Sequence, residues 1–377
     1  MIFTRVSGMS VDTISISRRQ FIAVVTAATA GAIHPRASAQ DNTADRSAIV
    51  VSELRKVSQE RRDRFAENSD GVTPRELNAL LPEITEIELR NDSATPPHGE
   101  RNLRIAAWNM ERGRFWEDGA KLIREQPALR DAGVILLGEM DLGMARSENV
   151  HTTRNMADAL GMNYAYAVEF LELTGGEKEE RERYPGANEW GYHGNAILSR
   201  YPMLNLRMLR FSGIEKWFGD YQQRLGGRNA LLAEIEVGGR AVTLCSTHLE
   251  SGGAPTDDAF RTEQGRYILA EMRDYAGDSP VLLGGDLNAR PNAQVVADLR
   301  AAGFDIDGAN DLAANTVQRL ANGRVETYAA HIDYLCPRGV EVIRSESSPA
   351  VVLAAYPPGL GGKMLGDHAI VTTELQI

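Results

Sequence analysis

Six short polar clusters, each directly after an apolar run, restrict the fold of this chain more than any other feature. An apolar run of about four to eight residues is typical of a buried strand. The polar cluster after it marks the point where the strand ends. The ordered series predicts one functional site, built from Trp108-Asn109, Glu139, Thr247-His248, Asp286-Leu287-Asn288, Asp333 and Asp367-His368.

Strand-like runs and helical patterns alternate from residue 101 to the end of the chain. Strands are predicted over residues 103–108, 134–137, 242–245, 281–283, 340–343 and 369–375. Helices are predicted over residues 155–160, 259–272 and 293–301. Many strands interleaved with fewer helices predict an α/β fold in which two packed sheets are flanked by helices. Residues 174–193 and 357–363 are interpreted as loops at the rim of the site.

The first 39 residues are interpreted as a leader. Ser17-Arg18-Arg19-Gln20-Phe21-Ile22 precedes a short apolar stretch, which is followed by Ala37-Ser38-Ala39. A twin arginine, an apolar region too short to span a bilayer and an A-x-A site are typical of an export signal. We therefore expect residues 1–39 to be a bacterial-type twin-arginine signal and the mature protein to be periplasmic or secreted. The alternative is a cytoplasmic protein with a basic start.

Residues 40–100 are predicted to form a helical extension and a linker. Apolar residues from Val50 to Phe65 fall near helical spacing, which predicts one amphipathic helix. Thr73-Pro74-Arg75-Glu76 is a capping box that predicts a short helix ending before Pro82. The extension is expected to pack on the outside of the domain formed by residues 101–377. A partner-binding arm is the alternative.

The chain without its leader is strongly acidic. Residues 1–39 contain four arginines and one aspartate, so the 41 basic and 52 acidic residues fall to 37 and 51, a net charge of −14. This charge repels polyanions at long range and disfavours non-specific binding to duplex DNA. Nothing after residue 39 approaches the roughly eighteen uninterrupted apolar residues of a membrane span, so no transmembrane segment is expected in the mature chain.

Only two cysteines are present, Cys245 and Cys336, both in or beside strand-like runs. Two cysteines form neither a disulfide framework nor a cysteine zinc site. They are expected to be either an oxidised pair or two buried thiols.

The residue types in the six clusters suit the hydrolysis of a phosphoester. That reaction needs positive charge near the developing oxyanions and a deprotonated water. Magnesium prefers oxygen ligands and needs only one or two carboxylates from the protein, so Glu139 is the best ligand candidate and Asn109 a second. Two histidines at strand ends, His248 and His368, can move protons near neutral pH.

The same clusters contain groups that can orient the reaction. Asp286 and Asn288 flank Leu287 and would point to the same side of an extended segment. Asp333 can hold a histidine in the required tautomer.

The series resembles the endonuclease/exonuclease/phosphatase family, the deoxyribonuclease-like metal phosphoesterases. The resemblance covers residues 101–377 and implies a four-layer α/β/β/α sandwich of two mostly antiparallel sheets flanked by helices, with the site at one edge of the sheets. It is carried by Trp108-Asn109, Gly138-Glu139, residues 194–199, residues 228–231, Thr247-His248-Leu249, residues 285–288, Ile332-Asp333-Tyr334 and Gly366-Asp367-His368. Glycine precedes Glu139 here, where the family often has glutamine.

The resemblance also implies a Mg²⁺ or Mn²⁺ cofactor, held by Glu139 with help from Asn109 and Asp367. His368, oriented by Asp333, would activate water or hold the phosphate.

The remaining roles follow from the same resemblance. His248 would stabilise the phosphate or protonate the leaving oxygen, and the two histidines are assigned jointly as acid and base. Asp286 and Asn288 would orient the nucleophile and the scissile phosphate. Arg228 is a candidate for substrate binding, while His193 is as readily interpreted as a loop residue.

We therefore expect an exported metal-dependent phosphodiesterase that acts on a small phosphodiester or a phospholipid headgroup. An extracellular or periplasmic nuclease is the second hypothesis, although the net charge disfavours nucleic acid. A non-catalytic relative that binds a partner through its rim loops is a hypothesis of another class. The full set of acids and histidines argues against that third hypothesis.

Overall fold

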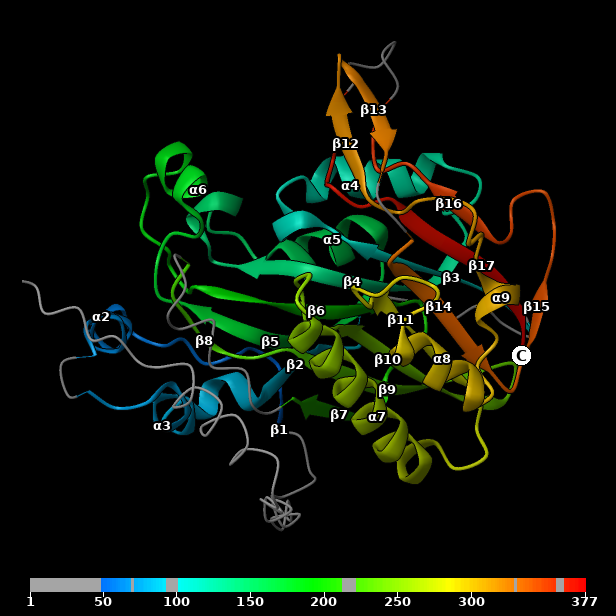
Figure 1. Ribbon diagram of the computed structural model, residues 1–377, viewed down its shortest axis with the longest axis horizontal. Coiled ribbons are helices and arrows are strands. Elements are labelled where there is room, and N and C mark those ends of the chain that lie inside the picture. The colour runs from blue at the N-terminus through cyan, green and yellow to red at the C-terminus, as the bar shows by residue number, and fades with distance from the viewer. Residues whose placement is uncertain (1–48, 69–70, 93–100, 212–221, 329–330, 357–362) are drawn as a thin grey trace, which may run out of the picture. The chain divides into compact units, whose positions relative to one another are not determined.

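The computed structural model describes residues 49–68, 71–92, 101–211, 222–328, 331–356 and 363–377. The predicted leader, the predicted linker from residue 93 and most of the loop at 357–363 lie outside the described residues. The described chain has a mixed α/β fold with two mixed sheets and flanking helices (Figure 1).

The larger sheet consists mainly of antiparallel neighbours, with β1–β2 and β3–β4 as its parallel pairs. In spatial order its strands are β1 (Ile49–Val51), β2 (Glu86–Arg90), β5 (Asn163–Glu172), β6 (Tyr192–Ser199), β4 (Ala132–Leu142), β3 (Asn102–Asn109), β17 (Ile370–Gln376) and β15 (Glu341–Ile343), with β8 (Arg224–Gly226) on β5 and β16 (Ala350–Val352) on β17.

The smaller sheet contains one parallel pair, β10–β11, among antiparallel neighbours. In spatial order its strands are β14 (Asp333–Arg338), β11 (Val281–Asp286), β10 (Arg240–His248), β9 (Asn229–Val237) and β7 (Leu204–Arg210). A separate hairpin is formed by β12 (Gln318–Ala321) and β13 (Arg324–Thr327).

Helices connect the parallel pairs, because parallel neighbours cannot be joined by a tight turn. Helix α4 (Trp116–Glu125) joins β3 to β4, and α7 (Pro255–Ala276) joins β10 to β11. The other helices are α2 (Gln59–Glu67), α3 (Pro74–Ala79), α5 (Thr152–Leu160), α6 (Lys178–Arg183), α8 (Gln294–Ala301) and α9 (Ile306–Ala309). Among the described residues, every helix is too short or too polar to span a bilayer.

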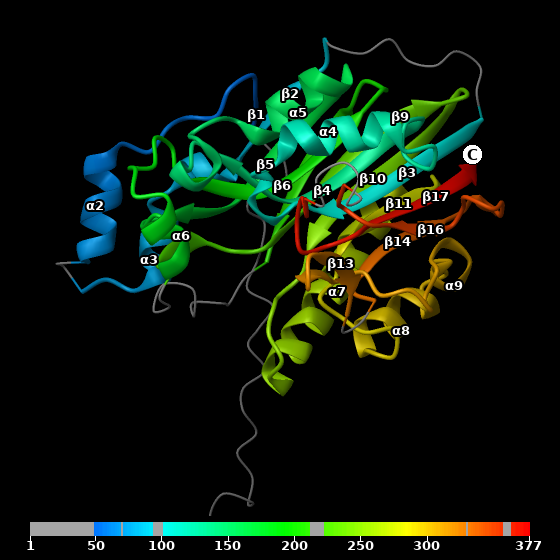
Figure 2. The same ribbon diagram turned by 90° about the horizontal axis from the view of Figure 1, so that it is seen from above.

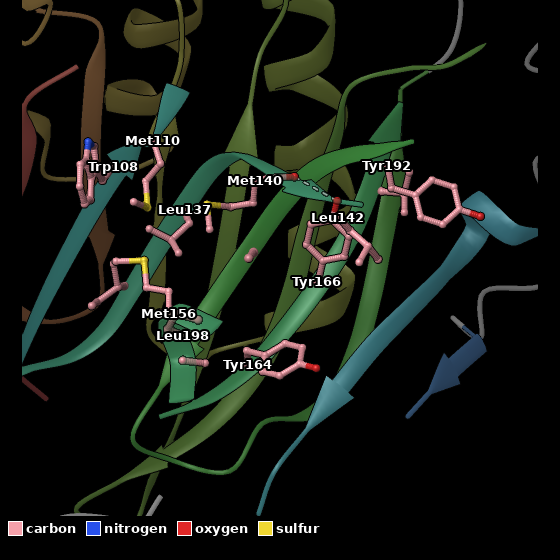
Figure 3. Packing of buried hydrophobic residues seen from close by; sticks show 14 of the residues in the cluster. Trp108, Met110, Leu137, Met140, Leu142, Met156, Tyr164, Tyr166, Tyr192 and Leu198 are labelled. Carbon is pink, nitrogen blue, oxygen red and sulfur yellow. Dashed lines mark hydrogen bonds between the residues drawn. The ribbon is translucent and has the colours of Figure 1, made fainter. Parts of the chain in front are cut away.

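Three buried apolar clusters fill the spaces between sheets and helices. Alternate residues of β4 face opposite ways, so Leu137 packs toward α4 and α5 while Leu136 packs toward the smaller sheet. The third cluster lies between the smaller sheet and helices α7 and α8. Helices thus cover the outer face of each sheet (Figure 2), and Figure 3 shows part of the cluster beneath α4 and α5. Burial on both faces explains why the β4 run is apolar throughout.

The predicted strands and helices after residue 101 are present, most of them longer at one or both ends than predicted. The extension differs from the prediction. Residues 49–51 and 86–90 are strands, and only residues 59–67 of the predicted first helix are helical. The capping box at Thr73 is confirmed. Apolar side chains between Leu54 and Ile84 join the main core, so the expectation of a helical extension on the outside is wrong for its described part.

The two cysteines are free and buried. Cys245 and Cys336 both align with Leu283, from strands on opposite sides of β11. Two strand spacings separate them, about 9–10 Å, whereas the Cα atoms of a disulfide lie roughly 4.4–6.8 Å apart. The alternative of two buried thiols is therefore correct.

Glu88 of β2 connects the extension to the rest of the fold. Its buried carboxylate accepts hydrogen bonds from the Leu54 backbone N–H at 2.9 Å and from the Tyr164 hydroxyl at 2.5 Å. It also meets the His151 ring at 3.1 Å and the Arg154 guanidinium at 2.9 Å. Burial alone would raise the pKa of Glu88, but these partners, His151 first, lower it to about 2.

We predict that Glu88→Gln removes part of the acid sensitivity of folding. A carboxyl group whose folded pKa is lowered stabilises the fold fully above its unfolded pKa, near 4.5, and loses that contribution as the pH falls toward about 2. The shift corresponds to roughly 3 kcal/mol. Urea unfolding from pH 7 to pH 3 should show a lower free energy of unfolding at pH 7 and a shallower acid decline in the variant. The exposed Asp131→Asn serves as the control, and an unchanged acid decline in Glu88→Gln would contradict the assignment.

Candidate active site

The ends of several strands converge at one edge of the two sheets. Strands β3, β10 and β11 end at Asn109, His248 and Asp286, and β14 begins at Asp333. The register places His248 opposite Asp286, and Asp286 opposite Asp333. In the other sheet Asn109 lies opposite Gly138, the residue before Glu139. Strand pairing therefore brings the predicted side chains together within each sheet.

A cavity of about 420 Å³ lies at this edge. Eight of the nine predicted site residues line it: Asn109, Glu139, Arg228, His248, Asp286, Asn288, Asp367 and His368. The ninth, Asp333, is buried behind His368 and contacts its ring Nδ1 at 2.8 Å. The structure thus places these residues together, while their roles remain predictions.

Glu139 lies at an irregularity of β4. The pairing of β4 with β6 shifts register between Leu137 and Met140, and Glu139 has a φ of 57°. Bulges and left-handed residues redirect side chains and occur preferentially at functional sites. Here the carboxylate forms an ion pair with Arg112 and lies 3.3 Å from the Asn109 amide. Burial opposes ionisation, but the charge of Arg112 holds the pKa of Glu139 well below its usual value.

Three carboxylates that line the cavity, Glu111, Glu139 and Asp367, influence one another. Burial and then the charge of Asp367 raise the pKa of Glu111. Burial raises the pKa of Asp367, and Glu139 adds to that effect. These carboxylates are an oxygen donor set of the kind that Mg²⁺ and Mn²⁺ prefer. The Asn109 side chain donates its amide N–H groups to Glu139 and Asp286, and its Oδ1 accepts from the Glu111 backbone N–H. The carboxylates therefore fit a hard divalent cation, which would relieve the repulsion between these acids.

A second group of potential ligands lies beside the first. Single atoms of Asp286, Asp333 and His368 all lie within 4.8 Å of one another. The His368 Nδ1 already contacts Asp333 at 2.8 Å, and its Nε2 lies 3.8 Å from Asp286. This arrangement can hold an ion through His368 Nε2 and Asp286, or it can act as a hydrogen-bonded proton relay.

The two candidate catalytic histidines have neighbours of opposite charge: acids surround His368, and an arginine contacts His248. Burial alone would lower the pKa of His368, but Asp333 and Asp286 raise it well above its usual value. His248 instead accepts a hydrogen bond on Nδ1 from Arg228 at 2.8 Å. A guanidinium has only donors, so the proton of the neutral ring is on Nε2. Burial, followed by the charge of Arg228, holds the pKa of His248 well below its usual value. The two rings therefore differ in charge at neutral pH.

Asp286 and Asn288 face the site for a reason that the sequence did not indicate. Strand β11 ends at Asp286, and Asn288 has a φ of 49°, so the backbone leaves the extended conformation here. The Asn288 backbone N–H donates to Asp286 Oδ1 at 2.8 Å. The nitrogen of the Asn288 side chain lies 2.9 Å from His248 Nε2. Burial and the charge of Asp333 raise the pKa of Asp286. A carboxyl group with a raised pKa is suited to take a proton near neutral pH.

Sequence reasoning missed several residues that line the cavity. His193 is not in a loop: it belongs to β6, and its Nδ1 lies 2.8 Å from buried Asp141. Arg112 follows the Asn109 cluster by three residues and contacts Glu139, Glu177 and Glu180. Glu177 and Glu180 lie at and in helix α6, in the predicted rim loop, and they line the cavity. Glu111 and Arg112, both with positive φ, had no spacing signal in the sequence.

The comparisons with known proteins agree with this architecture. The Endonuclease/Exonuclease/phosphatase family matches residues 106–368. The endonuclease/exonuclease/phosphatase from Beutenbergia cavernae has a TM-score of 0.54 and 18% identity over 74% of this chain and 72% of that chain. One from Bacteroides vulgatus has a TM-score of 0.51 and 14% identity over 73% and 99%. These two structures share the fold.

A sequence relative is Nocturnin from Drosophila melanogaster, which is 37% identical over 59 residues. The matched segment is 16% of this chain and 9% of that relative, so it covers a small part of both proteins.

We predict that Asp333→Asn lowers the pKa of His368, because the carboxylate on Nδ1 stabilises the charged ring. An opposite charge at this distance typically shifts a pKa by about 1–3 units. NMR titration of the ring resonances, with divalent ions removed, measures the change. The ring of His151, which lies in the Glu88 cluster, is the internal control. An unchanged His368 titration would contradict the assigned Asp333–His368 contact.

Proposed function

The chain belongs to the endonuclease/exonuclease/phosphatase family of phosphoesterase and nuclease-type hydrolases, and we propose that it is a metal-dependent phosphodiesterase acting on a small phosphodiester or a phospholipid headgroup. One observation carries the proposal. Three features lie in the same polar cavity: the carboxylate oxygen donors around Glu139, His368 with its acidic neighbours, and the buried Asp286. The three interlayer cores support a four-layer α/β/β/α sandwich as its scaffold.

The divalent ion is proposed to bind at Glu139, Asn109 and Asp367, where it would supply positive charge to a phosphoryl oxygen. Around that position the chain contributes two different hydrogen-bond donors. His368, charged and held by Asp333, presents Nε2–H with a full positive charge. His248, neutral and held by Arg228, presents Nε2–H without one. Both donors would stabilise charge that develops on the phosphoryl group.

Asp286 is proposed to take the proton from the attacking water. Its Oδ2 lies 3.4 Å from His248 Nε2 and 3.1 Å from the Asn109 amide nitrogen. Its raised pKa makes Asp286 a stronger base than an exposed aspartate, and Asp286 lines the cavity. Asn288 fixes its other oxygen through a backbone hydrogen bond.

The size and charge of the site support a small substrate. A cavity of about 420 Å³ falls within the usual range for small-molecule sites, roughly 300–1,000 Å³. The net charge of the full chain is −11, which repels polyanions. The twin arginines and the A-x-A site support export to the periplasm or beyond as a further part of the proposal.

We predict that Mg²⁺ raises the melting temperature of the purified protein and that Glu139→Gln abolishes this rise, because the ligand carboxylate is lost. The exposed Glu148→Gln is the matched control. Asp333→Asn distinguishes the two candidate ion positions. If Asp333→Asn abolishes the shift and Glu139→Gln retains it, the ion lies at the Asp286, Asp333 and His368 group instead.

Hydrolysis of bis-(p-nitrophenyl) phosphate, sphingomyelin and plasmid DNA, each with Mg²⁺ and with chelator, tests the reaction. His368→Ala should lower kcat by roughly 10²–10³-fold, because a charged donor to the developing oxyanion is lost. His248→Ala should lower it by about 10²–10³-fold, the range for a lost oxyanion donor. His151→Gln removes a buried histidine outside the cavity and should retain activity.

Preferred turnover of plasmid DNA would favour the nuclease hypothesis. Activity that survives the chelator on every substrate would reject the metal mechanism. No hydrolysis of any substrate, with unchanged behaviour of both histidine variants, would favour the non-catalytic binding relative.

A further inference from the structure

Two arginines that line the cavity lie against the same buried aromatic ring. The guanidinium carbon of Arg224 is 4.2 Å from the centroid of the Phe170 ring, and that of Arg228 is 5.4 Å from it. Both side chains are less than a tenth exposed, and both line the cavity. A single small ligand can therefore reach both guanidinium groups.

Glycines between the two arginines make this arrangement possible. Residues 224–228 have the sequence Arg-Leu-Gly-Gly-Arg, and β8 pairs with β5 through residues 224–226. Gly226 has a φ of 108°, and a Cβ atom there would lie 2.1 Å from the Glu169 carbonyl oxygen. The close approach to β5 requires glycine, and it returns the chain so that both arginines meet Phe170.

The two arginines have different partners. Arg228 donates to Glu169 at 3.0 Å and to His248 at 2.8 Å, which places it beside the reaction centre. Arg224 lies opposite Glu172 in the strand pairing, at 3.6 Å, beyond the usual hydrogen-bond distance. The same Glu172 oxygen accepts from Gln222 at 2.6 Å and lies 3.6 Å from Arg146.

Burial and neighbouring cations both act against the charge of Arg224. Burial lowers the pKa of Arg224 to about 10 despite Glu172, and the nearby charges of Arg228, Arg112 and Arg146 act in the same direction as burial. An anion in the cavity would stabilise the charged form. Planar guanidinium groups suit phosphate oxygens because they donate through two parallel N–H groups.

We propose that Arg224, with Gln222, forms a second anion subsite beside the scissile phosphate, so that the preferred substrate is a small phosphoester carrying a second phosphate group. The inference rests on the proposed function, which puts the scissile phosphate between His248, Asp286 and His368. Arg228 then serves the reacting phosphate, and Arg224 serves the second one. The second subsite determines specificity and takes no part in the bond cleavage.

Two esters that differ only in the second phosphate test the proposal: thymidine 5′-(p-nitrophenyl phosphate) and the same ester with a 3′-phosphate. The wild-type protein with Mg²⁺ should prefer the bis-anionic ester by roughly 10- to 100-fold in kcat/KM, the range for a charge-assisted contact. Arg224→Gln should reduce this ratio to near one, and Arg224→Lys should retain part of it. Equal turnover of both esters by the wild type, or an unchanged ratio in Arg224→Gln, would overturn the proposal.

Arg210→Gln is the matched control for the loss of a buried arginine. Burial also lowers the pKa of Arg210 to about 10, but Arg210 donates to backbone carbonyl groups and does not line the cavity. It should lower stability and leave the substrate ratio unchanged. A structural role of Arg224 would reduce turnover of both esters equally and leave the ratio at its wild-type value.

Calorimetry separates this proposal from the proposed function. Thymidine 3′,5′-bisphosphate should bind the wild-type protein at least roughly tenfold more tightly than thymidine 5′-monophosphate, and Arg224→Gln should remove the difference. If neither ester is hydrolysed but this binding difference is present, the subsite stands and the proposed function fails. If both esters are hydrolysed equally and the two nucleotides bind equally, the function stands and the subsite fails.

Discussion

The site depends on one pair of parallel strands in each sheet, because the carboxyl ends of parallel strands point to the same edge. A helix returns the chain between the two strands of each pair, so the end of β3 lies beside Gly138 of β4, and β10 and β11 end together. Packing of the two sheets face to face then brings both sets of ends together, with Asn109 and Glu139 on one side and His248 and Asp286 on the other. Polar groups at strand ends can face a cavity without interrupting the apolar core behind them. The same edge would be unavailable if either crossover were replaced by a hairpin, because antiparallel neighbours end at opposite edges.

Charge compensation then gives each group in this cavity its chemical state. Isolated charges in a buried site would be neutralised by shifted pKa values, so the identity of each partner decides what a side chain can do. His368 has acids as neighbours and is charged, whereas His248 has an arginine on Nδ1 and is neutral. Two histidines that look equivalent in the sequence therefore have different capacities, one as a cation and one as a neutral donor. The partners lie far away along the chain, since Asp333 precedes His368 by 35 residues and Arg228 precedes His248 by 20.

This distance along the chain explains what the sequence could and could not predict. Apolar runs and the polar groups at their ends are local patterns, so the strands, the crossover helices and the grouping of the site residues could be predicted. The partner of His248, the ion pair of Arg112 with Glu139 and the burial of His193 depend on tertiary contacts that have no local pattern. The left-handed backbone at Asn288 was missed because Asp-Leu-Asn is compatible with both an extended and a left-handed conformation. The strands of the extension were missed because three and five residues in a charged segment give a weak periodic signal.

The extension has a structural consequence for the cavity, because β2 of the extension and β8, which contains Arg224, both pair with β5. Strand β2 pairs with residues 164–167 of β5, and β8 pairs with residues 170–172 of the same strand. The two short strands therefore cover successive parts of one edge of β5, which would otherwise expose unpaired backbone groups. Phe170 and Glu172, which contact Arg224, belong to the part covered by β8, directly beyond the part covered by β2. The Glu88 cluster fixes β2 against α5 and β5 through His151, Arg154 and Tyr164. The extension thus completes the strand on which the anion-binding wall of the cavity is built.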